Sequence, residues 1–125
     1  MAFENDGKPV PNMAELATRA REIQTEMQHE LQELAKKEYN SIVVAGQVKV
    51  KMTGNFTVNE VYISPDYLPT HTAQQISDAI ALAFNNCKYD IDRERQEIVT
   101  RYQQLSNETV MRMLGQNSGK TDTDN

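Results

Sequence analysis

Lys49 and Lys51 alternate with three apolar residues in the segment Val48–Met52, and no acidic residue lies between the two lysines. Alternate side chains of a strand point to opposite faces, so the apolar residues are expected to be buried and both lysines to face water. Two ammonium groups on one exposed face suit contact with phosphate groups. Lys49 and Lys51 are therefore the first candidates for a nucleic-acid contact.

Further basic residues lie in two segments that have helical periodicity. Several have an acidic neighbour four residues away, as in Glu33–Lys37 and Arg93–Glu97, which is typical of a solvated helix surface. Two interpretations stay open for them, namely contact with DNA phosphates or ordinary exposed charge. These helical candidates for DNA contact are Arg19, Arg21, Lys36, Lys37, Arg93, Arg95 and Arg101.

The overall charge of the chain limits how it could bind a nucleic acid. It carries 13 basic and 18 acidic residues, for a net charge of −5 at neutral pH. A negative chain is repelled by phosphates at long range, and affinity for nucleic acid comes largely from neutralising them. Any nucleic-acid role must therefore depend on a local basic surface.

Groups that could catalyse a reaction or hold a metal are few. His29 and His71 do not belong to a metal-spaced pair. The run Asp90–Glu94 resembles the start of a calcium loop, but it lacks the turn glycine and the distal glutamate. Cys87 is the only cysteine and falls on an apolar helical stripe, so we expect a small buried hydrophobe. The sequence predicts no enzyme, no cofactor and no metal site.

The first element that must position these residues is a long N-terminal helix. Asn12 and Glu15 have the spacing of a capping box, which predicts that the helix begins at Asn12. Its apolar stripe is narrow, as in a helix with a single packing partner. The stripe consists of Met13, Leu16, Ala20, Ile23, Met27, Leu31 and Leu34.

A period of two then predicts three antiparallel strands. The first covers about Ser41–Val44, and the second is the lysine-bearing segment Val48–Thr53. Gly54-Asn55 can form a tight hairpin turn before a third strand over Phe56–Ile63. The apolar phase slips within that strand, which predicts a β-bulge near Asn59-Glu60.

A second helix is expected to begin near Thr72 or Ala73 and to exceed about 30 residues, as its sustained periodicity indicates. Composition predicts a flexible segment at 1–11, one domain at 12–114 and a disordered tail at 115–125. No signal peptide and no membrane-spanning run is recognisable, so we expect a cytoplasmic protein without membrane contact. The stripe of the second helix consists of Ile76, Ile80, Ala83, Cys87, Ile91, Ile98, Tyr102 and Leu105.

The predicted fold class is α+β, with a long N-terminal helix, a three-stranded antiparallel β-meander and a long C-terminal helix. Two helices with thin apolar stripes cannot cover three strands well, and exposed strand edges are a liability in a monomer. A symmetric homodimer solves both problems by joining apolar faces and helices. The sequence therefore predicts that the chain pairs with itself.

Several short motifs follow one another along the chain, namely Val48–Gly54, Val61–Pro65 with Leu68 after it, and Ala83-Phe84-Asn85. In their order and spacing they resemble the YbaB/EbfC family of bacterial nucleoid-associated proteins. The resemblance covers roughly Asn12 to Leu105. The chain departs from the family pattern where a single glycine, Gly46, replaces a glycine-rich segment, and where a longer helix and a polar tail replace the usual C-terminal end.

The resemblance implies a nucleoid-associated homodimer that binds double-stranded DNA, mainly through its backbone and with little sequence preference. It implies no catalytic activity and no cofactor, and it offers no compact binding motif to transfer. The alternative is a dimeric scaffold or adaptor that binds another protein and does not bind DNA. The acidic net charge and the extended second helix favour this alternative.

Overall fold

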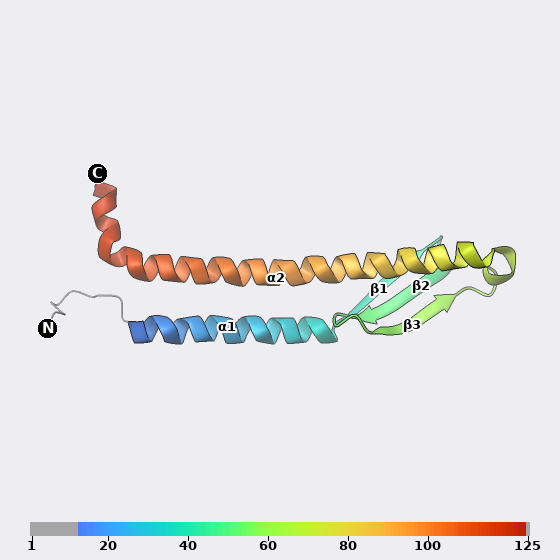
Figure 1. The fold of residues 1–125 in the computed structure, drawn as a ribbon, viewed down its shortest axis with the longest axis horizontal. Helices are drawn as coiled ribbons and strands as arrows, with labels where there is room; N and C mark the ends of the chain where they lie inside the picture. The colour runs from blue at the N-terminus through green and yellow to red at the C-terminus, as the bar shows by residue number, and fades with distance from the viewer. Residues whose placement is uncertain (1–12, 125) are drawn as a thin grey trace. The chain divides into compact units, whose positions relative to one another are not determined.

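The computed structural model describes the backbone of residues 13–124 and the side chains of residues 13–115. The order of helices and strands confirms the predicted α+β arrangement (Figure 1). The Asn12 cap and the segment predicted to be flexible at 1–11 lie outside the described residues. The elements are α1 (Met13–Lys36), β1 (Glu38–Val43), β2 (Val48–Thr53), β3 (Val58–Ile63), a 3-10 turn η1 (Leu68–Thr70) and α2 (Ala73–Asp124).

The chain divides into two compact units within the range predicted as one domain. The helical unit contains residues 13–29 of α1 and residues 98–124 of α2. The sheet unit contains residues 30–97, and therefore all three strands. Both α1 and α2 contribute residues to each unit.

The sheet is an antiparallel meander in the order β1-β2-β3. β1 begins at Glu38 and not near Ser41, and it pairs with β2 from Glu38↔Thr53 to Val43↔Val48. The buried positions of β1 are Tyr39, Ser41 and Val43. A serine in the middle of this buried row hides the alternation of β1 in the sequence, which explains why the strand begins earlier than its apolar pattern predicts.

The turn between β1 and β2 contains three consecutive residues with positive φ, at 46° for Val44, 58° for Ala45 and 88° for Gly46. This left-handed turn matches the twist of the two strands that it joins. A β-branched residue is disfavoured in this conformation by about 1–2 kcal/mol. Val44 therefore belongs to the turn, and the prediction that includes Val44 in the first strand is wrong.

The predicted bulge is confirmed, because Lys51 pairs with Glu60 while Met52 pairs with Val58, which leaves Asn59 as the extra residue. The hairpin loop before it is longer than the predicted two-residue turn, and β3 begins at Val58 and not at Phe56. The Asn55 side-chain oxygen accepts a hydrogen bond from the Thr57 backbone N–H at 3.2 Å and so stabilises the longer loop.

α2 begins at Ala73, as predicted, and is 52 residues long. Thr72 Oγ1 accepts a hydrogen bond from the Gln75 backbone N–H at 3.1 Å, and Gln75 Oε1 accepts one from the Thr72 N–H at 2.9 Å. This reciprocal capping box fixes where the helix starts. Its bounds reach Asp124 and thus include most of the stretch 115–125, whose disorder in solution stays a prediction.

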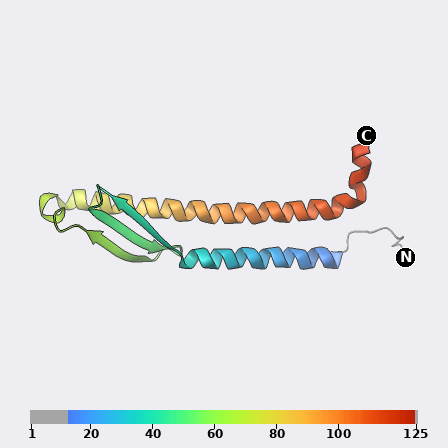
Figure 2. The same ribbon diagram turned by 180° about the vertical axis from the view of Figure 1, so that it is seen from behind.

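The core of the sheet unit forms where the first turns of α2 run along the sheet, as both views show (Figures 1 and 2). Small residues of α2, including Ala83 and Cys87, are fully buried and allow a close approach to the strands. The Cys87 thiol lies 3.7 Å from the Tyr39 carbonyl oxygen and 3.6 Å from that of Val50. Burial, with the Asp90 carboxylate adding to it, raises the pKa of the Cys87 thiol. The predicted buried, hydrophobe-like role of Cys87 is confirmed.

Candidate nucleic-acid interface

The face of the sheet that points away from α2 carries both candidate lysines, and we call it the outer face. Strand register places Lys49 between Ile42 on β1 and Tyr62 on β3. Ile42 is 62% exposed and Tyr62 is 39% exposed. The outer face therefore combines a cation with accessible aliphatic and aromatic surface.

The neighbouring row on the outer face places Lys51 between Asn40 and Glu60. The Lys51 ammonium lies 3.5 Å from the Glu60 carboxylate, so part of its charge is neutralised. The Lys49 ammonium lies 5.6 Å from the centre of the Tyr62 ring, and no ion pair among the described residues includes Lys49. Lys49 is therefore the better placed of the two lysines to contact a phosphate.

Of the seven helical candidates, Arg19, Arg21 and Arg101 belong to the helical unit, and the other four belong to the sheet unit. Local ion pairs occupy several of them, which supports the interpretation as solvated helix surface. Arg93 pairs with Glu97 at 3.9 Å, as the sequence predicts, and Arg19 pairs with Glu22 at 3.1 Å. Further pairs are Lys36 with Glu33 at 3.9 Å and Arg93 with Asp90 at 3.8 Å.

Lys37 forms its ion pair across the fold. Its ammonium donates to Glu94 Oε1 at 2.9 Å, and the Tyr39 hydroxyl donates to the same oxygen at 2.8 Å. These hydrogen bonds hold the pKa of Glu94 below its ordinary value. Burial, followed by the interaction with Glu94, raises the pKa of Tyr39. Lys37 thus joins the start of the sheet to α2, which argues for a structural role and against a free phosphate contact.

Glu94→Gln is expected to lower the free energy of unfolding by about 1–2 kcal/mol at neutral pH, because a neutral amide accepts weaker hydrogen bonds than a carboxylate. The folded pKa of Glu94 is depressed, so its contribution is present above the unfolded value of 4.5 and is lost as the pH falls through the folded value. The wild-type chain should therefore lose this stabilisation in acid, and the variant should not. Urea titrations at neutral and acidic pH measure both effects.

Glu97→Gln is the matched control, because Glu97 lies on the same helix and its one ion pair within the described residues is with the exposed Arg93. Its effect on the free energy of unfolding should stay below about 0.5 kcal/mol. Equal effects of the two substitutions would contradict the role assigned to Glu94.

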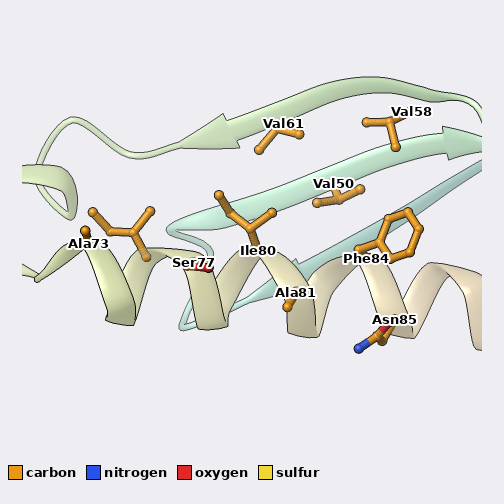
Figure 3. Close-up of a pocket in the computed structure, with 10 residues that line it drawn as sticks. Val50, Val58, Val61, Ala73, Ser77, Ile80, Ala81, Phe84 and Asn85 are labelled. Carbon is orange, nitrogen blue, oxygen red and sulfur yellow. The ribbon is translucent and has the colours of Figure 1, made fainter.

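A second feature of the sheet unit is an apolar groove of about 600 Å³ between β3 and α2. Figure 3 shows Ile80 and Phe84 pointing from α2 toward the strands, with Val58 and Val61 on the opposite side. Val58 is 42% exposed and Val61 is 45% exposed. The sequence assigned Ile80 to the buried stripe and did not predict that this part of the stripe lines an open groove.

The part of the chain that contains the outer face and the groove is similar to known proteins. Residues 8–105 match the YbaB/EbfC DNA-binding family, and this range includes the whole sheet unit. The chain belongs to the YbaB/EbfC family. The family resemblance deduced from the motifs is therefore confirmed.

Individual YbaB/EbfC relatives are of similar length to the matched region. A nucleoid-associated protein of Metamycoplasma arthritidis is 32% identical over 95 residues, which are 76% of this chain and 98% of that protein. One from Xylella fastidiosa is 34% identical over 86 residues, covering 69% of this chain and 78% of its own. One from Xanthomonas campestris is 35% identical over 86 residues, with coverages of 69% and 79%.

Two kinds of feature are absent from the described residues, namely membrane-spanning helices and metal-binding clusters. None of the helices there combines the length and apolar character that a membrane crossing requires. In the same part of the chain, no three His, Cys, Asp or Glu residues are grouped so that they could hold a metal ion. The absence of enzyme activity and of a cofactor stays a prediction.

Proposed function

We propose that this protein is a nucleoid-associated homodimer that binds double-stranded DNA, mainly through the phosphate backbone and with little sequence preference. The observation that carries the proposal is the match to the YbaB/EbfC DNA-binding family over residues 8–105. Names of relatives that include the term nucleoid-associated support the proposed location on DNA in the cytoplasm.

The outer face supplies the proposed DNA contact, with Lys49 as its principal cation. A lysine is a flexible point charge, which suits contact with phosphates and reads no base pattern. Lys51 would add to the contact once a phosphate competes with Glu60 for its ammonium. Because the chain is acidic overall, this contact depends on local charge, and its affinity should fall steeply as salt rises.

The groove between β3 and α2 supports the proposed dimer, with a second copy of this chain as its occupant. Every residue of β3 is exposed or half-exposed, so this edge strand lacks cover in the single chain. Exposed apolar surface beside an edge strand favours association. In a two-fold symmetric pair, each subunit covers the groove of the other, and both copies of the outer face become available to one duplex.

A gel-shift titration with random-sequence duplex DNA at low and moderate salt tests the proposal, together with light scattering to measure the oligomeric state. A dimer that shifts the duplex at low salt and releases it at moderate salt is the expected result. A dimer that shifts no DNA at low salt would favour the alternative, a scaffold that binds another protein. The acidic balance of the chain is the specific observation that supports this alternative.

A further inference from the structure

Phe56 occupies an unusual position at the tip of the β2–β3 hairpin. Its φ of 65° lies in the left-handed region, which bulky residues rarely adopt, and 40% of its surface is exposed. A glycine or an asparagine would adopt this conformation more easily. The loop thus holds an aromatic ring at the surface at the expense of a disfavoured backbone conformation, which is a pattern found at binding sites.

The hairpin tip is anchored to the elements around it. The Gly54 N–H donates to the Lys37 carbonyl oxygen at 3.0 Å, and Arg95 Nη2 donates to the Gly54 carbonyl oxygen at 2.9 Å. Gly54 also has no room for a side chain, because a Cβ there would overlap the Leu34 carbonyl oxygen. The Phe56 ring is therefore presented from a fixed support.

Two cations of α2 lie near this ring. The Lys88 ammonium lies 5.8 Å and the Arg95 guanidinium carbon 5.7 Å from the ring centre. Lys88 is also paired with Asp92 at 2.9 Å. No ion pair in the described part of the chain includes Arg95, so its charge is not balanced by a carboxylate. An accessible aromatic ring with two cations near it is complementary to a flat base attached to phosphates.

We propose that Phe56, Lys88 and Arg95 form a contact for an unpaired nucleotide of DNA. The base stacks on the Phe56 ring. The Lys88 ammonium turns to an adjoining phosphate, and Arg95 donates to a phosphate through its other N–H groups while Nη2 keeps its hydrogen bond to Gly54. The inference rests on the proposed function and deepens it, because it names the kind of DNA that the protein prefers. In an intact duplex, the faces of the bases are stacked on neighbouring base pairs. A bulge, a nick or a single strand exposes the face of a base, which can then stack on the Phe56 ring.

A competition experiment with two DNAs tests the proposal, using an intact random-sequence duplex and the same duplex with one unpaired adenine. The wild-type protein should bind the bulged duplex about tenfold more tightly, as the energy of one base stacked on an aromatic side chain implies. In Phe56→Leu, the ratio of the affinity for the bulged duplex to that for the intact duplex should fall to about one, and the affinity for the intact duplex should be unchanged. In Phe56→Tyr, the preference should remain.

Tyr89→Leu is the matched control, because Tyr89 is another aromatic residue of the sheet unit, 66% exposed with Arg93 over its ring at 5.8 Å. It should keep the preference for the bulge. A fluorescent adenine analogue at the unpaired position reports stacking directly in the wild-type protein, whatever the stability of the variants. Stacking of the adenine analogue on Phe56 should change the fluorescence of the analogue.

Each contrary result has a distinct meaning. Equal wild-type affinity for the two DNAs, an unchanged preference in Phe56→Leu, or an unchanged analogue fluorescence would overturn the Phe56 contact and leave the proposed function standing. Failure of the wild-type protein to bind either DNA would overturn the proposed function itself, and this inference with it.

Discussion

The Val61→Asp variant is expected to be monomeric at micromolar concentration, where we expect the wild-type chain to be a dimer. Val61 lies in the groove with Ile80 and Phe84, and its 45% exposure means that a single subunit tolerates a polar side chain there. In the proposed dimer, the second copy would enclose the new carboxylate without a partner, and symmetry would place two such carboxylates in the interface. The dimer dissociation constant should rise by at least about 100-fold.

Ile42→Asp is the matched control for this prediction. Ile42 is also a β-branched residue on an edge strand, but it lies on the outer face and is 62% exposed. Sedimentation analysis of both variants measures the dissociation constants, and circular dichroism reports whether each subunit remains folded. A Val61→Asp variant that stays dimeric, or an Ile42→Asp variant that dissociates equally, would remove the groove from the proposed interface.

The groove marks a limit of what apolar periodicity can predict. Ile80 and Cys87 repeat at helical spacing in one stripe, and the sequence treats them alike. In the fold, Cys87 is fully buried beneath the sheet, whereas Ile80 lines the open groove. The difference in burial between Cys87 and Ile80 depends on how far the sheet covers the helix. The apolar period of the helix does not show how far that cover extends.

The strands show which local signals are reliable. The bulge at Asn59 was predictable because a slip in the apolar phase has few structural explanations. The turn at Val44 and Ala45 was not, because these residue types disfavour the left-handed conformation that they adopt. Closing the hairpin between two well-paired strands overrides that local preference, so the cause lies in the pairing of β1 with β2 and not in the turn residues.

Charge pairs were predictable only where both partners lie on one helix. Arg93 and Glu97 pair as the spacing predicts. Lys37 instead pairs with Glu94, 57 residues away, although Glu33 lies four residues before it on the chain. Such long-range pairs decide which cations remain available to a ligand. The sequence could therefore put Lys49 and Lys51 first among nine basic candidates but could not predict that Glu94 pairs with Lys37.

The double variant Lys49→Glu, Lys51→Glu is expected to bind duplex DNA about 100-fold more weakly than the wild-type protein at low salt. In a dimer, the substitutions replace four cations with four anions on the two outer faces. The slope of log affinity against log salt should become shallower by about 0.9 for each phosphate that the variant no longer neutralises, and so by up to about four. Arg112→Glu controls for overall charge, since Arg112 is an exposed cation of the helical unit that is not a candidate for DNA contact.

Single neutral substitutions separate the contributions of the two lysines. Lys49→Gln should weaken binding more than Lys51→Gln, because Glu60 already neutralises part of the Lys51 charge at 3.5 Å. For the same reason, Glu60→Gln should strengthen binding, since it releases the Lys51 ammonium for a phosphate. Fluorescence anisotropy with a labelled duplex over a range of salt concentrations measures all three. An unchanged affinity in Lys49→Gln would contradict the role of Lys49 as the principal cation of the DNA contact.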